Sequence, residues 1–257
     1  MRDAGLSAAI QAAGSIGELA RRLGISQPSV SNWSRIPAER VLAVEAATGV
    51  DRSLLRPDLH PAEAPAPVDE IDAARAREYA LLAALLARAP DLDLLRRLRM
   101  LRSDGSAIGD AHGALAAAAA EADPATVERE HFDLFVGLGR GELMPYGSYY
   151  LTGFLHERPL ARLRGDLAAL GIASADGNPE PEDHAAILCE IMAGLAGGRF
   201  PAPAGSDQRI FARHLAPWIG RFFQDLEKAE RARFYRAVGA LGRTFVEIES
   251  EAFTLAA

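Results

Sequence analysis

Residues 180–192 read EPEDHAAILCEIM, an acidic run that passes directly into a continuous apolar segment. Pro181 suits the first turn of a helix, and acidic residues in that turn complement the positive end of the helix dipole. The sequence therefore predicts a helix over about 181–196.

Three side chains of this expected helix are spaced i, i+4 and i+7, so they share one face. They are Asp183, Ile187 and Glu190. An acidic, apolar and acidic stripe could bind a peptide that mixes arginines with apolar residues. The alternative is helix capping with a solvated face, and spacing alone favours that alternative.

Helical spacing of apolar residues continues along the chain, and alternating runs that would predict strands are absent. Helices are expected over 69–102 with an interruption at Pro90, over 107–121, from Asp123-Pro124 to the glycines at 137–141, and near 147–156, 158–170, 206–224 and 227–251. The predicted fold class is therefore all-α.

A proline-rich stretch divides the 257 residues. Four prolines stand between residues 57 and 67, which excludes a helix interior. We predict a small helical domain over 1–60, a linker over 57–68 and a larger helical bundle over 69–257.

Residues 16–33, IGELARRLGISQPSVSNW, have the mechanics of a helix-turn-helix. Gly24 supplies the turn, Ser26 can cap the second helix, and Pro28 fits its first turn. Val30 and Trp33 point inward at i, i+3, which leaves polar side chains outward to reach base edges in a major groove.

This stretch and its surroundings, over about residues 4–61, resemble the YdaS-like antitoxin family of Cro-like helix-turn-helix domains. The resemblance implies that Gln27, Pro28, Ser29 and Asn32 face bases. Phosphate contacts are expected from Arg21, Arg22 and Arg35. A single such domain would bind duplex DNA weakly, so DNA binding favours a homodimer. The alternative is a helix-turn-helix used only for packing or dimerisation.

Charge is distributed unevenly. Residues 1–60 carry 7 arginines and 6 acidic residues, a net +1, within a chain whose net charge is −7. The remainder is therefore at −8 and is a poor candidate for phosphate-backbone binding. It suits a cationic partner better, or it is merely a soluble acidic surface.

Two further motifs precede EPEDH: EHFDLF at 130–135, which leads into GLGRG, and PYGSYY at 145–150. Glu130 begins a stripe with Leu134, Tyr146 is of a type more often found in a core, and Ser148 can cap a following helix. Spacing alone gives these residues structural roles.

In this order, the three motifs resemble the TorD family of cytoplasmic maturation chaperones for molybdenum oxidoreductases, over about 70–257. The resemblance implies an all-α fold that binds the twin-arginine signal peptide of an apo-molybdoenzyme until its cofactor is inserted. The family motif E-P-x-D-H falls on Glu180, Pro181, Asp183 and His184. Tyr146, Glu130, Ile187 and Glu190 complete the expected peptide site. The loop around 137–160 is most similar to the group associated with formate dehydrogenases, and some relatives form domain-swapped dimers.

Other chemistries lack their signals. There is no P-loop, the GLGRG run follows a helix and not a strand, and no histidine is spaced with Cys189 as a metal pair. No apolar run has the length of a membrane span and no secretory signal is present. We therefore expect a cytoplasmic non-enzyme without cofactor or metal. The alternative function is a transcriptional regulator or antitoxin-like protein whose helical domain senses a client or pairs subunits.

Overall fold

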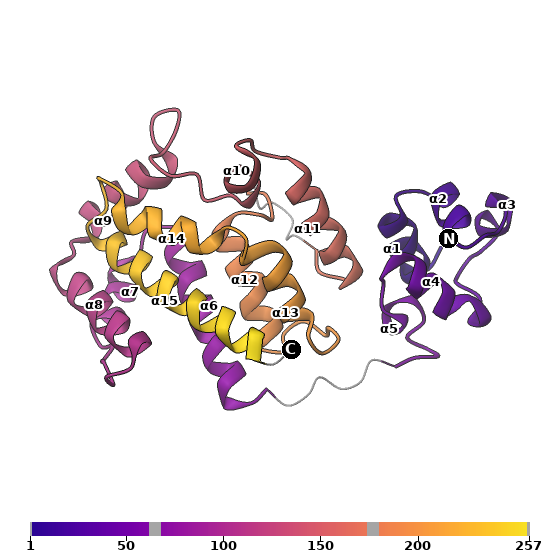
Figure 1. Cartoon of the computed structure of the whole chain (residues 1–257), viewed down its shortest axis with the longest axis horizontal. Coiled ribbons are helices and arrows are strands. Elements are labelled where there is room, and N and C mark those ends of the chain that lie inside the picture. The colour runs from indigo at the N-terminus through magenta and orange to yellow at the C-terminus, as the bar shows by residue number, and fades with distance from the viewer. Residues whose placement is uncertain (1, 62–67, 174–179, 256–257) are drawn as a thin grey trace.

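The computed structural model describes residues 2–61, 68–173 and 180–255. Within these ranges the regular structure is helical. The described residues form no strand, and their β-structure is limited to one isolated bridge. The all-α prediction is therefore confirmed. Helices α1 to α5 gather at one end of the molecule, apart from the larger group α6 to α15 (Figure 1).

The first group consists of α1 (Ala4–Ala13), α2 (Ile16–Arg22), α3 (Gln27–Ser31), a 3-10 turn η1 (Ala38–Arg40), α4 (Val41–Thr48) and α5 (Arg52–Leu55). The second group begins with α6 (Glu70–Ala87), α7 (Leu92–Leu98), α8 (Ala107–Glu121), α9 (Pro124–His131), a π-helical turn η2 (Phe132–Val136) and α10 (Gly147–Thr152). It continues with α11 (Arg158–Ala169), α12 (Ala185–Ala196), α13 (Ser206–Ile210), a second π-helical turn η3 (Phe211–Leu215), α14 (Ile219–Lys228) and α15 (Phe234–Leu255).

The helix-turn-helix has the predicted mechanics. Gly24 adopts φ +65°, which favours glycine, and the Ser26 hydroxyl accepts from the amide of Ser29 at 3.4 Å. Val30 is fully buried, and Trp33 packs against the same core at half-buried depth. The apolar sides of α1 to α5 thus close over a small core of their own.

The linker starts later in the structure than the predicted residue 57. Arg56 is buried, and its guanidinium donates to the Ile36 carbonyl at 2.6 Å and to the Asp58 carboxylate at 2.7 Å. The amides of Leu59 and His60 donate back to the Arg56 carbonyl, so residues 57–60 turn onto the first group. Residues 62–67 lie outside the described residues.

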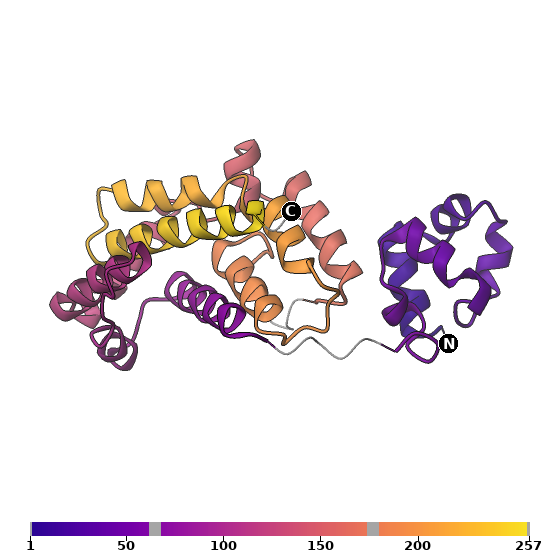
Figure 2. The ribbon, with the colours of Figure 1, turned by 60° about the horizontal axis from the view of Figure 1, so that its bottom comes forward.

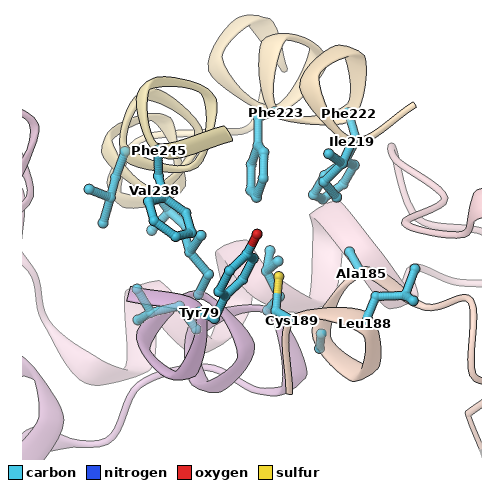
Figure 3. Packing of buried hydrophobic residues seen from close by; sticks show 14 of the residues in the cluster. Tyr79, Ala185, Leu188, Cys189, Ile219, Phe222, Phe223, Val238 and Phe245 are labelled. Atoms are coloured by element: carbon cyan, nitrogen blue, oxygen red, sulfur yellow. The ribbon is translucent and has the colours of Figure 1, made fainter. Parts of the chain in front are cut away.

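The second group has a separate, larger core. Helix α6 packs on α12, α14 runs beside α15, and α15 also packs on α8 (Figures 1 and 2). Tyr79 stands between the aromatic rings from α14 and α15, with Cys189 of α12 beside it (Figure 3). Its ring meets Phe245 edge-on, with 4.7 Å between the centroids.

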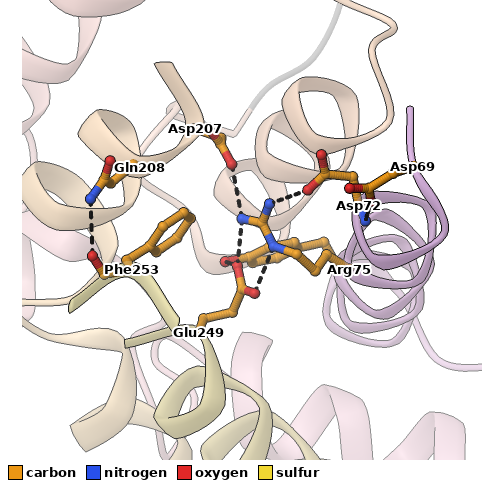
Figure 4. Close-up of polar contacts among 8 residues, drawn as sticks. Asp69, Asp72, Arg75, Asp207, Gln208, Glu249 and Phe253 are labelled. Carbon is orange, nitrogen blue, oxygen red and sulfur yellow. Dashed lines mark hydrogen bonds and ion pairs between the residues drawn. The ribbon is translucent and has the colours of Figure 1, made fainter. Parts of the chain in front are cut away.

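A network around Arg75 closes one side of this core (Figure 4). The Arg75 guanidinium binds Glu249 at 2.8 Å, Asp207 at 2.9 Å and Asp72 at 2.6 Å, and the Tyr79 hydroxyl donates to Glu249 at 2.9 Å. The buried Glu249 carboxylate is therefore paired. The network joins α6, α13 and α15.

Several helix bounds differ from the prediction. The helix expected over 147–156 ends at Thr152, because Gly153 leaves it at φ +83°. The helix expected over 206–224 is broken by the π-helical turn η3 and by Trp218. The helix expected over 227–251 is α15, which spans Phe234–Leu255. By contrast, the 107–121 helix is confirmed at both ends.

The two groups touch at the end of α11. Ala169 packs against the core of the first group, and the Leu54 methyl groups lie over Gly171. Among the described helices, none combines the length and apolar character that crossing a membrane requires.

Candidate functional site

The EPEDH motif does not begin a helix as predicted. Helix α12 starts at Ala185, and His184 is its N-cap, with Nδ1 accepting from the Ala186 amide at 3.1 Å. Pro181 lies in a turn before the helix. Asp183 therefore stands outside the helix and does not share a face with Ile187 and Glu190, so the predicted stripe is wrong.

The motif pairs instead with the start of PYGSYY. Tyr146 and His184 form an isolated antiparallel bridge. The Gly147 amide donates to the Asp183 carbonyl at 2.9 Å, and the Ala185 amide donates to the Pro145 carbonyl at 2.8 Å. Two segments that are far apart in the sequence are thus held together at one place.

Asp183 is the centre of this junction. Its side chain is 3% exposed, and its Oδ2 accepts from the Ser148 amide at 2.7 Å and from the Ser148 hydroxyl. Ser148 was expected to cap a helix, and it serves instead as the double donor to Asp183. The second oxygen, Oδ1, is buried and has no hydrogen-bond partner. A buried carboxylate oxygen without a donor is costly, so this atom needs a ligand or water.

Tyr146 and Glu180 flank the junction. The Tyr146 hydroxyl donates to Glu180 Oε2 at 2.7 Å, and its ring meets the His184 ring edge-on at 5.0 Å. Burial, and then the Glu180 carboxylate, raise the pKa of Tyr146 above its usual range. Burial lowers the pKa of His184. Tyr146 is therefore a neutral donor and His184 a neutral cap.

A pocket of about 260 Å³ opens beside Asp183. Leu151 of α10 and Pro159 and Leu163 of α11 supply apolar walls, and Arg162 lines it as well. A larger pocket of about 820 Å³ lies between residues 51–61 and 195–207. We place the candidate site at the smaller one, because, of these two pockets, only this one is lined by a residue with a buried carboxylate oxygen that has no partner among the described residues.

The remaining wall comes from η3. A π-helical turn shifts side chains out of the α-helical register, and such turns often accompany functional sites. Here it brings Arg213 and His214 to the pocket, and both bind Asp166, at 2.9 Å and 2.6 Å. Burial outweighs Asp166 and lowers the pKa of His214. Sequence analysis missed Arg162, Arg213 and His214, because no local motif marks them.

The other predicted peptide contacts lie elsewhere. Glu130 is buried and accepts from the amides of Arg233, Phe234 and Tyr235, at 2.7, 3.1 and 2.8 Å, which caps α15. Ile187 packs half-buried against the core. Glu190 is exposed and faces Arg199 at 3.8 Å. None of these three lines the pocket.

The helix-turn-helix presents the expected polar surface. Four predicted base-facing residues of α3 and its C-cap are exposed: Gln27, Pro28, Ser29 and Asn32. The predicted phosphate contacts are exposed but paired with acids. Arg21 and Arg22 both bind Glu18, at 2.6 and 3.0 Å, and Arg35 faces Asp58 at 3.6 Å.

Metal binding finds no support in the part of the chain that the structure describes. No group of three or more His, Cys, Asp or Glu side chains gathers there in a way that could hold an ion. Cys189 is buried, and burial raises the pKa of its thiol to about 12. Burial therefore disfavours the thiolate, which is the form of cysteine that binds metals and acts as a nucleophile.

Comparison with known proteins agrees with both resemblances. Residues 102–224 match the family model described as nitrate reductase delta subunit, and residues 6–64 match the model of bacterial toxin YdaS. The chaperone protein TorD of Shewanella loihica is 27% identical over 202 residues, which cover 70% of this chain and 92% of the relative. The TorD of Vibrio cholerae is 27% identical over 124 residues, covering 45% of this chain and 56% of the relative.

A putative redox enzyme maturation protein from Archaeoglobus fulgidus is a solved structure with a TM-score of 0.47 and 21% identity, covering 66% of this chain and 93% of its own. The sequence matches include the pocket-forming segments from Gly147 to His214. The larger helical group is therefore similar to the chaperone protein TorD and to the nitrate reductase delta subunit model, and the N-terminal group is similar to bacterial toxin YdaS.

Proposed function

We propose that this protein is a TorD-like maturation chaperone, and that it holds the apo form of a molybdenum oxidoreductase by binding its N-terminal twin-arginine signal peptide at the Asp183 pocket. One observation carries the proposal: Asp183, whose Oδ1 is buried without a partner, lines a pocket that also has apolar walls. An arginine side chain suits such a place, because its head donates to a carboxylate while its stem packs on apolar walls.

The bound peptide would run across the junction of the two motifs. One guanidinium donates to Asp183 Oδ1, and its stem lies along Leu151, Pro159 and Leu163. Glu180, Pro181 and His184 fix the turn that presents Asp183, and Tyr146 ties Glu180 to it. Glu130, Ile187 and Glu190 lie outside this path, and the first two support the fold.

The biological setting follows from the resemblance. The client is held in the cytoplasm until its cofactor is inserted, and the chaperone performs no reaction of its own. The loop around 137–160 favours a formate dehydrogenase as the client. Co-purification of the chain with its bound protein identifies which enzyme it serves.

Calorimetry with a twin-arginine signal peptide tests the site. Asp183→Asn keeps the shape of the side chain and removes its charge. We expect it to weaken binding by about 30-fold or more, since losing one side of a buried charged contact costs about 2–5 kcal/mol. Replacing both peptide arginines by lysine should also weaken binding, because lysine lacks the planar fork.

Glu190→Gln is the matched control, an acidic residue of α12 that lies outside the pocket. It should leave the affinity unchanged, and circular dichroism should show equal helicity for both variants. If wild type and Asp183→Asn bind the peptide with equal affinity, the peptide does not bind at this pocket.

A second function, DNA binding by the N-terminal group, is favoured by the exposed polar surface of α3. Gln27, Pro28, Ser29 and Asn32 would read base edges, and Arg21, Arg22 and Arg35 would contact phosphates. Since Glu18 holds two of these arginines, DNA must compete with it for them. A homodimer would supply the second half-site.

A fluorescence anisotropy titration with genomic duplexes tests this function. Glu18→Gln should strengthen binding at low salt, because it releases Arg21 and Arg22. Replacing both arginines by alanine should flatten the salt dependence, since each phosphate contact adds about 0.9 to the slope. Gln27→Ala should relax the sequence preference. If no duplex binds wild type or Glu18→Gln at micromolar dimer, the group is a protein interaction module.

A further inference from the structure

The rim of the Asp183 pocket carries a guanidinium that nothing neutralises. Arg162 is exposed on α11 and lines the pocket, and no ion pair or hydrogen bond engages it among the described residues. Neighbouring arginines differ, because Arg213 binds Asp166 at 2.9 Å and Arg164 binds Glu182 at 2.8 Å. Arg162 is thus available to a ligand.

The pocket therefore has charges of both signs at different depths. The Asp183 carboxylate is 3% exposed, whereas Arg162 reaches solvent. The apolar side chains of Leu151, Pro159 and Leu163 line the same pocket. A ligand that carries only positive charge would satisfy the buried carboxylate but meet a like charge at the rim, which is unfavourable.

We propose that this pocket selects peptides in which an acidic residue lies close to the bound arginine, with Arg162 as the residue that reads the acid. This specificity rests on the proposed function, because it requires that an arginine of the peptide pairs with the Asp183 carboxylate. The acidic side chain pairs with Arg162 while the arginine enters the pocket. Peptides of equal positive charge without the acid bind less well.

A scan with synthetic peptides tests the specificity. The host is an amidated twelve-residue peptide with two adjacent arginines followed by leucines and flanked by glutamines. Glutamate replaces one glutamine at a time, at each of three positions before and after the arginine pair. We expect one position to raise the affinity about threefold, the scale of an exposed ion pair.

Charge reversal gives the sharper result. In Arg162→Glu the preference at that position should invert, so that a lysine there binds better than a glutamate. Arg158→Gln is the matched control, an exposed arginine four residues earlier on α11 that does not line the pocket. It should keep the wild-type preference.

The outcomes separate the two proposals. If the host peptide binds wild type but no glutamate position gains affinity, or Arg162→Glu keeps the wild-type preference, the acidic specificity is overturned and the arginine site stands. If the host peptide does not bind wild type at all, and a lysine version behaves identically, the arginine site itself fails.

Discussion

Individual buried and half-buried histidines make the stability of the larger helical group depend on pH. Burial lowers the pKa of His131, His184 and His214, so each favours its neutral form in the folded state. His112 has the opposite shift, because its ion pair with Glu78 raises its pKa. Stability from the first three is lost as pH falls below the ordinary histidine value of about 6.5. Stability from His112 is lost as pH rises through its raised pKa.

His131 offers the clearest test. Its ring lies against Phe135 and Tyr235, and its Nε2 is buried without a partner. His131→Phe removes the titration, so the free energy of unfolding should rise less between pH 5 and pH 7.5 than in wild type. Urea unfolding followed by Trp218 fluorescence, in a Trp33→Phe background, reports on this group alone.

His112→Gln should change the same pH slope in the other direction. Its pair with Glu78 opposes the buried histidines, so without it the rise in stability toward pH 7.5 should become steeper. Identical slopes in wild type and both variants would show that neither histidine is linked to folding.

At the scale of elements, the first residue of a helix is predicted well where its N-cap is close in the sequence and poorly where the capping contact is distant. Helix α8 spans the predicted residues, and its cap is local: the Ser106 hydroxyl accepts from the Gly109 amide at 3.1 Å. Helix α12 does not, because Asp183, expected inside the helix, instead accepts from the amide of Ser148, 35 residues away. His184 then takes the N-cap position, for which histidine gives no signal.

The same contrast holds for the candidate site. The motifs predict one site for Tyr146, Glu180, Asp183 and His184, and in the structure these residues lie together at the junction of the two segments. The pocket walls on α11 and η3 come from packing between elements far apart along the chain. No periodicity or spacing within α11 or η3 predicts that the two elements meet. The sequence therefore could not identify Arg162 and His214 as pocket residues.

Helix α15 depends on a cap from another helix, the Glu130 carboxylate of α9 that accepts from three of its first amides. Glu130→Ala would leave these donors unpaired at a buried site, so we expect a loss of about 3 kcal/mol in the free energy of unfolding. Glu128→Ala, two residues earlier and exposed, is the matched control and should change it by less than about 0.5 kcal/mol. A loss no larger than that of the control would show that water replaces the cap.

At the scale of the whole molecule, two separate cores predict two units that fold alone. The contact between them joins α1 to α11 and includes Leu54, Ala169 and Gly171. A chain of residues 69–257 should therefore melt cooperatively and keep its helical circular dichroism. Its loss in stability should be small, about 1–2 kcal/mol at most, since only a few apolar groups become exposed.

Peptide affinity completes this test, because the Asp183 pocket is built entirely from the second group. The shortened chain should bind the twin-arginine peptide as tightly as the full chain, whereas residues 2–61 alone should not bind it. Leu54→Ser in the full chain weakens the contact between the two groups without removing either one. Both groups should still unfold cooperatively in this variant. A shortened chain that is molten or insoluble would mean that the first group is part of the fold of the second, and that the linker joins two parts of one domain.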